Sequence, residues 1–226
     1  MGYSYHYNSI GGAIINNTIA SNSYSIRFNF ESAGNIMYAL SKATNIRKNN
    51  DGEYAILGIP YAQYVKGEFD FSKNIRIDHR NSFAFHIGMG IAVPYGNAKT
   101  IPFEKQYFSG GANSVRGWTV RDLGPGSFVR DENTNLLDQS GDIKLDASIE
   151  YRSKLFWKFQ GAIFVDAGNI WTIRDYDNQP GGVFKFDKFY KQIAVAYGLG
   201  LRLDLDFFIL RFDGGMKALN PVYEKG

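Results

Sequence analysis

Hydrophobic and polar residues alternate with a period of two along much of this chain. Between Ile143 and Arg152 the two kinds take turns without a break. The same design recurs at 24–31, 83–93 and 192–204. A helix would spread these apolar residues around its whole circumference, whereas a strand places them on one face. The pattern therefore predicts β-strands.

Further strands are expected near 3–8, 61–72, 156–168 and 207–217. Together these segments make about eight strands, and many of them are longer than the roughly 5–6 residues usual in soluble proteins. A tilted strand that crosses a membrane needs about 9–11 residues. The strand lengths therefore favour a membrane-spanning sheet.

The expected connections differ in length. Tight turns are predicted at Ser153-Lys154 and from Asp204 to Asp206, whereas long polar segments occupy 32–57, 109–140 and 172–189. Short turns on one side and long loops on the other are typical of an outer-membrane barrel. The chain has no apolar run near the roughly 18 residues of a membrane helix, so a membrane-spanning form must be a closed barrel.

A soluble β-sandwich with an apolar core would give the same alternation, and the pattern alone leaves both architectures open. Two features favour the barrel. The less apolar face is rich in Gly and Ala, which suits a curved and crowded lumen. Aromatic residues also gather towards strand ends, where an interfacial girdle lies in membrane barrels; they are Phe71, Tyr95, Tyr151, Trp157 and Trp171.

Composition narrows the function classes. The formal charge is +3 and the basic residues are scattered, so we expect no nucleic-acid partner. There is no cysteine, which argues against a disulfide framework or a thiolate metal site. The start of the chain lacks the basic and apolar regions of a signal peptide, and we therefore expect a fragment of a longer secreted protein.

One glycine-rich segment, 108–118, opens the long loop expected at about 109–140, and it carries a resemblance. Its marked residues are Gly110, Gly111, Val115, Arg116, Gly117 and Trp118. The segment resembles the signature loop of the BamA/TamA outer-membrane assembly family, in the form found in Bacteroidetes-type bacteria. In that family a Val-Arg-Gly-aromatic tetrad folds back into the barrel lumen.

Three further segments resemble the same family, in the same order and spacing. They are Ser148–Arg152, Phe164–Trp171 with its F-x-D-x-G pattern, and the pair Gly198–Arg202 and Leu210–Asp213. Together with the loop they cover about residues 104–218. An upstream segment, Glu31 to Asn35, resembles the family more weakly.

The resemblance implies a lumenal receptor for Arg116, made of Glu150, Phe164, Asp166 and Gly168. Alternation agrees, because it places Glu150 on the polar face of its strand and the other three on one face of the next. A guanidinium can bond two carboxylates at once, which an ammonium cannot do as a planar fork. Gly117 is expected to let the loop turn tightly. The alternative is that Arg116 is a solvated loop charge and the two acids merely line a pore.

We therefore expect an all-β chain, with residues 1–226 forming a single partial domain. The resemblance implies the C-terminal part of an antiparallel transmembrane β-barrel of about 16 strands, with about eight present and the closing strand missing. The chain stops at Pro221–Gly226. Open edges of such a piece would be prone to aggregation.

The resemblance further implies an outer-membrane assembly factor that templates the folding of client β-barrel proteins at a lateral seam. Its expected partners are outer-membrane lipid, the clients, and periplasmic or lipoprotein accessory subunits. The alternatives are a two-partner-secretion-type polypeptide transport pore and a soluble binding module. We expect no enzyme activity, no cofactor and no metal site; His86 is read as a lumen-lining residue, and the acidic segment after Asp175 lacks the twelfth-position acid of a calcium loop.

Overall fold

A computed structural model describes residues 1–9, 22–50, 52–130, 138–205 and 207–222. Eight strands form one antiparallel sheet in the order β1-β2-β5-β6-β7-β8-β9-β10, so each strand of the sheet pairs with its neighbours along the chain. Their bounds are β1 Gly2–Ser9, β2 Ser23–Ala33, β5 Tyr64–Arg76, β6 Asn81–Pro94, β7 Ile143–Lys154, β8 Phe159–Trp171, β9 Ala194–Asp204 and β10 Ile209–Leu219.

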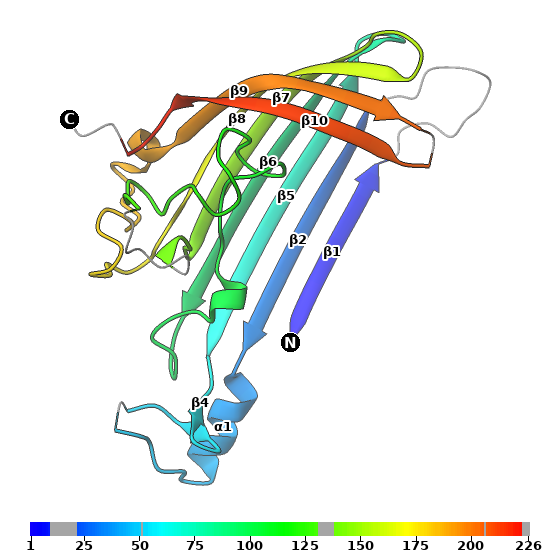
Figure 1. Ribbon diagram of the computed structural model, residues 1–226. Helices are drawn as coiled ribbons and strands as arrows, with labels where there is room; N and C mark the ends of the chain where they lie inside the picture. The colour runs from blue at the N-terminus through cyan, green and yellow to red at the C-terminus, as the bar shows by residue number, and fades with distance from the viewer. Residues whose placement is uncertain (10–21, 51, 131–137, 206, 223–226) are drawn as a thin grey trace.

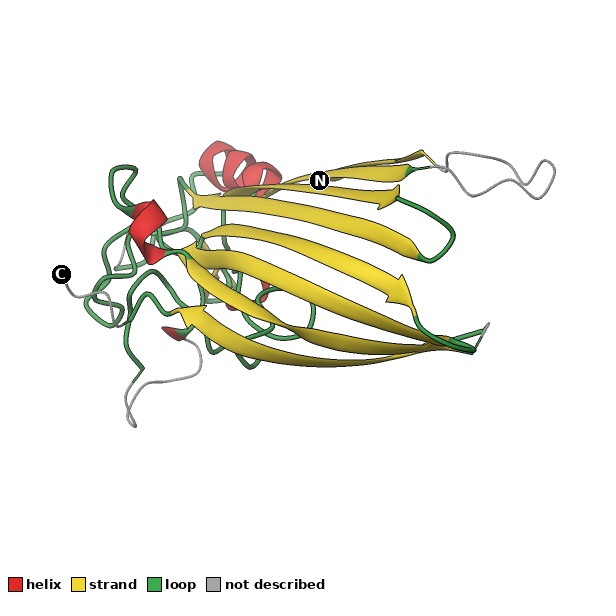
Figure 2. Ribbon diagram, turned by 90° about the horizontal axis from the view of Figure 1, so that it is seen from above, coloured by secondary structure: helices red, strands yellow, loops and turns green. Residues whose placement is uncertain are grey.

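The sheet is curved and open, with β1 at one edge and β10 at the other (Figure 1). Figure 2 shows the long connections and the helices gathered at one end of the strands. They include helix α1 (Asn35–Ala43), the two-residue strands β3 (Ala55–Ile56) and β4 (Ile59–Pro60), and the short 3-10 helices η1 (Phe103–Lys105) and η3 (Phe189–Gln192). Unequal ends of this kind are the arrangement of an outer-membrane barrel.

Burial in the sheet is inverted relative to a soluble protein. In β6, Ile87, Met89 and Ile91 are 42%, 47% and 48% exposed, while the glycines between them are buried. In β7 and β8 the carboxylates Glu150 and Asp166 are 4% and 0% exposed. We call the charged, concave side the inner face and the apolar side the outer face. A soluble sandwich would bury its large apolar residues between sheets, so this distribution matches a lipid-facing barrel wall instead.

The predicted strands are confirmed, with shifted boundaries. The segments expected at 61–72 and 156–168 lie at 64–76 and 159–171. The turn predicted at Ser153-Lys154 is wrong, because β7 continues through Lys154 and the chain turns at 155–158. Asp206 of the other predicted turn and residues 223–226 lie outside the described residues.

The structure corrects the expectations for the polar segment 32–57 and for Trp171. The polar segment 32–57 contains helix α1, which was not predicted. Trp171 lies at the end of β8 as expected, but it is fully buried, with the rings of Phe184 and Phe189 edge-on to it at 5.6 and 6.3 Å. No helix in the described part of the chain has the length and hydropathy to cross a membrane.

Candidate functional site

The connection between β6 and β7, residues 95–142, runs against the inner face of the sheet (Figure 1). Tyr107 and Gly141 pair as an antiparallel bridge, and Ser109 pairs with Leu123, so the loop has a defined backbone path. The ring of Tyr107 lies where a side chain at Gly90 of β6 would be, since a Cβ there would come within 2.5 Å of that ring. The loop therefore packs on the small residues of the barrel wall. Its residues 131–137 lie outside the described part of the chain.

The glycines of the predicted motif have separate tasks. Gly110 and Gly111 have φ values of 98° and 86°, which disfavour any side chain. The backbone N–H of Gly111 donates to the carbonyl oxygen of Trp118 at 2.8 Å and closes the turn. Gly117 has no such φ, which corrects the expectation that it makes the tight turn. A Cβ at Gly117 would instead lie 2.8 Å from the Cβ of Ala196 in β9.

Arg116 is the charged centre of the site. Its Nε and Nη2 atoms donate to the two carboxylate oxygens of Asp166, both at 2.8 Å. Its Nη1 donates to Glu150 at 2.7 Å. The backbone N–H of Arg116 also donates to Asp166, at 3.0 Å. The guanidinium thus spans two neighbouring strands with the bidentate geometry that only arginine offers.

Burial excludes the reading of Arg116 as a solvated charge. The side chains of Arg116, Glu150 and Asp166 are 7%, 6% and 0% exposed. The ring of Phe164 lies under the guanidinium, with 3.4 Å from its centroid to the Cζ of Arg116. Phe164 therefore shields the ion pair and adds a cation–π contact.

Glu150 accepts from more than one arginine. Besides Arg116, its carboxylate is paired with Arg152 at 2.6 Å and with Arg202 of β9. A carboxylate shared by several guanidinium groups keeps its charge compensated within a buried setting. Glu150 is thus a junction between the loop and strands β7 and β9.

The sequence analysis includes Gly168 in the receptor, and the structure corrects this. No contact with Arg116 is seen for it among the described residues; it lies opposite Asp146 in the register of β7 and β8. A Cβ at Gly168 would come within 2.6 Å of the carbonyl oxygen of Leu145. Its role is to allow close backbone packing between the two strands.

The apolar residues of the motif fill a small core beside the ion pairs. Val115 and Trp118 are 0% and 5% exposed and cluster with Leu123, Ala194 and Ala196. The cluster joins the loop to the inner face of β9, where small side chains leave room for it. Arg116 is thus held in place by the ring of Phe164 and by the packing of its chain neighbours in this cluster.

Two charged residues of the site were not predicted from the sequence. Arg202 binds Glu150, and Asp213 of β10 lies 3.5 Å from Nη1 of Arg116. Both fall within the segments that carry the resemblance and on the polar face of their strands. Alternation could have placed them on the inner face, but it carries no information on which distant loop they meet.

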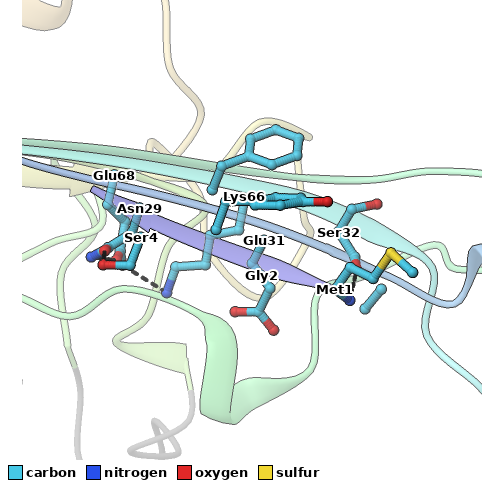
Figure 3. Close-up of a pocket in the computed structure, with 11 residues that line it drawn as sticks. Met1, Gly2, Ser4, Asn29, Glu31, Ser32, Lys66 and Glu68 are labelled. Atoms are coloured by element: carbon cyan, nitrogen blue, oxygen red, sulfur yellow. Dashed lines mark hydrogen bonds and ion pairs between the residues drawn. The ribbon is translucent and has the colours of Figure 1, made fainter.

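A second group of contacts holds the loop further along its path. Lys105 is paired with Glu31 of β2 at 2.7 Å, and the hydroxyl of Tyr64 donates to the same carboxylate at 2.7 Å. Lys66 of β5 donates to the carbonyl oxygen of Lys105 at 3.1 Å and is paired with Glu68 at 3.0 Å. Glu31, Lys66 and Glu68 line a hollow of about 430 Å³ beside β1 (Figure 3).

This arrangement binds and positions a loop. In the described part of the chain, no group of three or more His, Asp or Glu side chains is placed to hold a metal ion. His86 lies on the inner face, 3.4 Å from both Asp70 and Asp146, as a lumen-lining residue would. The ion pairs of Arg116 and Lys105 brace the loop against the wall.

Comparison with known proteins places this geometry in a family. A stretch of 99 residues is 35% identical to the outer membrane protein assembly factor BamA of Neisseria meningitidis serogroup B; it covers 40% of this chain and 12% of that protein. The fold is similar to the crystal structure of BamA from Haemophilus ducreyi lacking POTRA domains 1-3, with a TM-score of 0.56 and 17% identity. That match covers 96% of this chain and 50% of the BamA chain.

The chain thus spans half of the solved relative and a smaller share of the curated one. Residues 16–224 match the Omp85 superfamily domain, which is nearly the whole sequence. The open eight-stranded sheet, the apolar outer face and the loop that lies on the inner face agree with that match. This chain is an outer-membrane β-barrel segment and belongs to the Omp85 superfamily.

Proposed function

We propose that the full-length protein inserts client β-barrel proteins into the outer membrane. In this proposal a client strand pairs with a weakly sealed edge of the barrel, whose backbone hydrogen bonds template the new sheet. Membership of the Omp85 superfamily and the likeness to an assembly factor support it. The expected partners are lipid, unfolded clients and accessory subunits, and the process needs no catalytic group or cofactor of this chain.

The observation that carries the proposal is the seated loop. Arg116 is held by Glu150 and Asp166 on the inner face, so the protein's own loop occupies this side of the sheet. A transport pore for an unfolded polypeptide, the alternative function, would need that loop to leave its carboxylates. Breaking a buried ion pair by removing one partner costs about 3–5 kcal/mol. The seated loop therefore favours insertion over passage through the lumen.

The test uses the full-length protein in liposomes with an unfolded client barrel, and the readout is the protease-protected, folded client. Arg116→Ala is expected to lower the initial insertion rate several-fold, because the loop loses both carboxylate contacts. Arg116→Lys should recover only part of that rate, since an ammonium cannot bond both carboxylates in the plane of a fork. Arg27→Ala serves as the control, because Arg27 is an exposed arginine on the inner face of β2.

Equal insertion by Arg116→Ala and the wild type would contradict the role of the brace. Release of a passenger polypeptide across the liposome membrane, without insertion of the client, would favour the transport pore. In that case Arg116→Ala should increase passage, because the loop would leave the lumen more readily.

A further inference from the structure

The loop that carries Arg116 touches the inner face of strand β10 between Arg211 and Lys217. The inward-pointing residues there are Arg211, Asp213, Gly215 and Lys217, which alternate with the exposed Phe212 and Met216 of the outer face. Each of the four meets residues 112–118 of the loop. The two carboxylates of β7 and β8 explain the seating of Arg116, but they do not explain this second surface.

Asp213 joins two arginines that come from different elements. Its Oδ2 atom lies 2.9 Å from Nε of Arg211 and 3.5 Å from Nη1 of Arg116. The side chain of Asp213 is 7% exposed, so its charge is compensated by these two groups and not by bulk water. Arg211 reaches onward and donates from Nη2 to the carbonyl oxygen of Ala112 at 2.6 Å.

The backbones of loop and strand also meet closely. A Cβ at Gly215 would come within 2.5 Å of the carbonyl oxygen of Arg116, so only glycine allows this approach. The ammonium group of Lys217 lies 5.0 Å from the centre of the Trp118 ring. Gly200 of β9 makes room for Asp213, because a Cβ there would lie 2.5 Å from Oδ1 of Asp213.

Within the described residues β10 has one hydrogen-bonded neighbour, β9. We infer that Arg211 and Asp213 are positioning residues that latch β10 to the Arg116 loop. The seated loop then limits how freely β10 separates from β9, and in the full-length protein it thereby sets how readily this part of the sheet opens during client insertion. This last consequence rests on the proposed function.

The experiment is hydrogen exchange of the full-length protein in lipid, followed on peptides of β10, of β7 and β8, and of the loop. The variants are Asp213→Asn and Arg211→Gln, with Asp213→Glu as the conservative version. Asp70→Asn is the matched control, because Asp70 is an inner-face acid that pairs with His86 and not with the loop. Client insertion into liposomes is measured on the same preparations.

In Asp213→Asn and Arg211→Gln, the β10 amides that bond to β9 are expected to exchange about tenfold faster, since each change removes a charge-assisted hydrogen bond. Exchange in β7 and β8 should stay at the wild-type rate, because Glu150 and Asp166 still hold Arg116. Asp213→Glu should exchange more slowly than Asp213→Asn. A general loss of folding would raise exchange in all strands alike and so is told apart.

Unchanged β10 exchange in both variants would overturn the latch, whatever the insertion assay shows. Faster β10 exchange together with a changed insertion rate would support the latch and its link to insertion. Faster β10 exchange with insertion equal to wild type would leave the latch standing and overturn its link to insertion.

Discussion

At the scale of single residues, the site depends on small side chains as much as on charged ones. Arg116 reaches its carboxylates only because glycine and alanine on the inner face let the loop come close. Gly117 makes one of these close contacts, since it faces Ala196 of β9 and the backbone of Met216 of β10. A single methyl group at this position should therefore disturb the seat without touching any charge.

We expect Gly117→Ala to destabilise the seated loop by about 1–3 kcal/mol, the usual range for overpacking. Its Cβ would lie 2.8 Å from the Cβ of Ala196. The measurement is the urea midpoint of the full-length protein in lipid. Ala196→Gly, combined with Gly117→Ala, should recover part of the loss because it removes the opposing methyl group, and Ala196→Gly alone is the control. A double variant no more stable than Gly117→Ala would argue against this packing account.

The two carboxylates that bind Arg116 could be predicted from the sequence, whereas the residues around them could not. Alternation and the family resemblance indicated Glu150 and Asp166, because both lie on polar faces of neighbouring strands. Asp213 and Arg202 reach the same centre only through the curvature of the sheet and the path of the loop, which period-two patterns do not encode. Gly168 allows close packing against β7, and this role likewise depends on strand register, which the pattern does not give.

At the scale of elements, the strands were predictable because long alternating runs leave little choice of structure. Helix α1 was missed since its apolar residues face outward: Ile36, Met37 and Leu40 are 62%, 47% and 55% exposed. A nine-residue helix within a long polar segment gives a short and weak periodic signal. The sequence indicated the path of the loop at Arg116 only. Glu31, which lies in the more weakly matched upstream segment, anchors the other end of the loop through Lys105.

The loop between Lys105 and Arg116 thus acts as a strut with two unequal anchors. The side chains of Lys105 and Glu31 are 40% and 33% exposed, against 7% for Arg116. An exposed pair contributes about 0–1 kcal/mol. We expect Lys105→Ala to leave overall stability nearly unchanged and to raise hydrogen exchange at 103–107 only.

The control for this strut is Arg116→Ala, which should raise exchange at 112–118 and lower stability. If Lys105→Ala raised exchange at both 103–107 and 112–118, the loop would be one cooperative unit. That result would contradict the picture of two separate anchors.

Taken as a whole, the sheet is inside out compared with the sheet of a soluble protein. Large apolar side chains such as Leu199, 66% exposed, cover the outer face, and buried carboxylates occupy the inner face. In water this distribution would be costly, since exposed apolar patches promote association. In lipid it is the expected one, because the bilayer solvates the outer face and the loop fills the inner one.

The most direct test is depth labelling of the full-length protein in lipid. This chain has no cysteine, and any cysteine elsewhere in the full-length protein is replaced by serine. A fluorophore is attached to a cysteine at Met89 of the outer face or at Arg27 of the inner face, and quenched in turn by a lipid-borne and a water-soluble quencher. We predict that the lipid quencher acts on the label at Met89 and the water-soluble quencher on the label at Arg27. A label at Met89 reached by the water-soluble quencher and spared by the lipid one would contradict the membrane-barrel account.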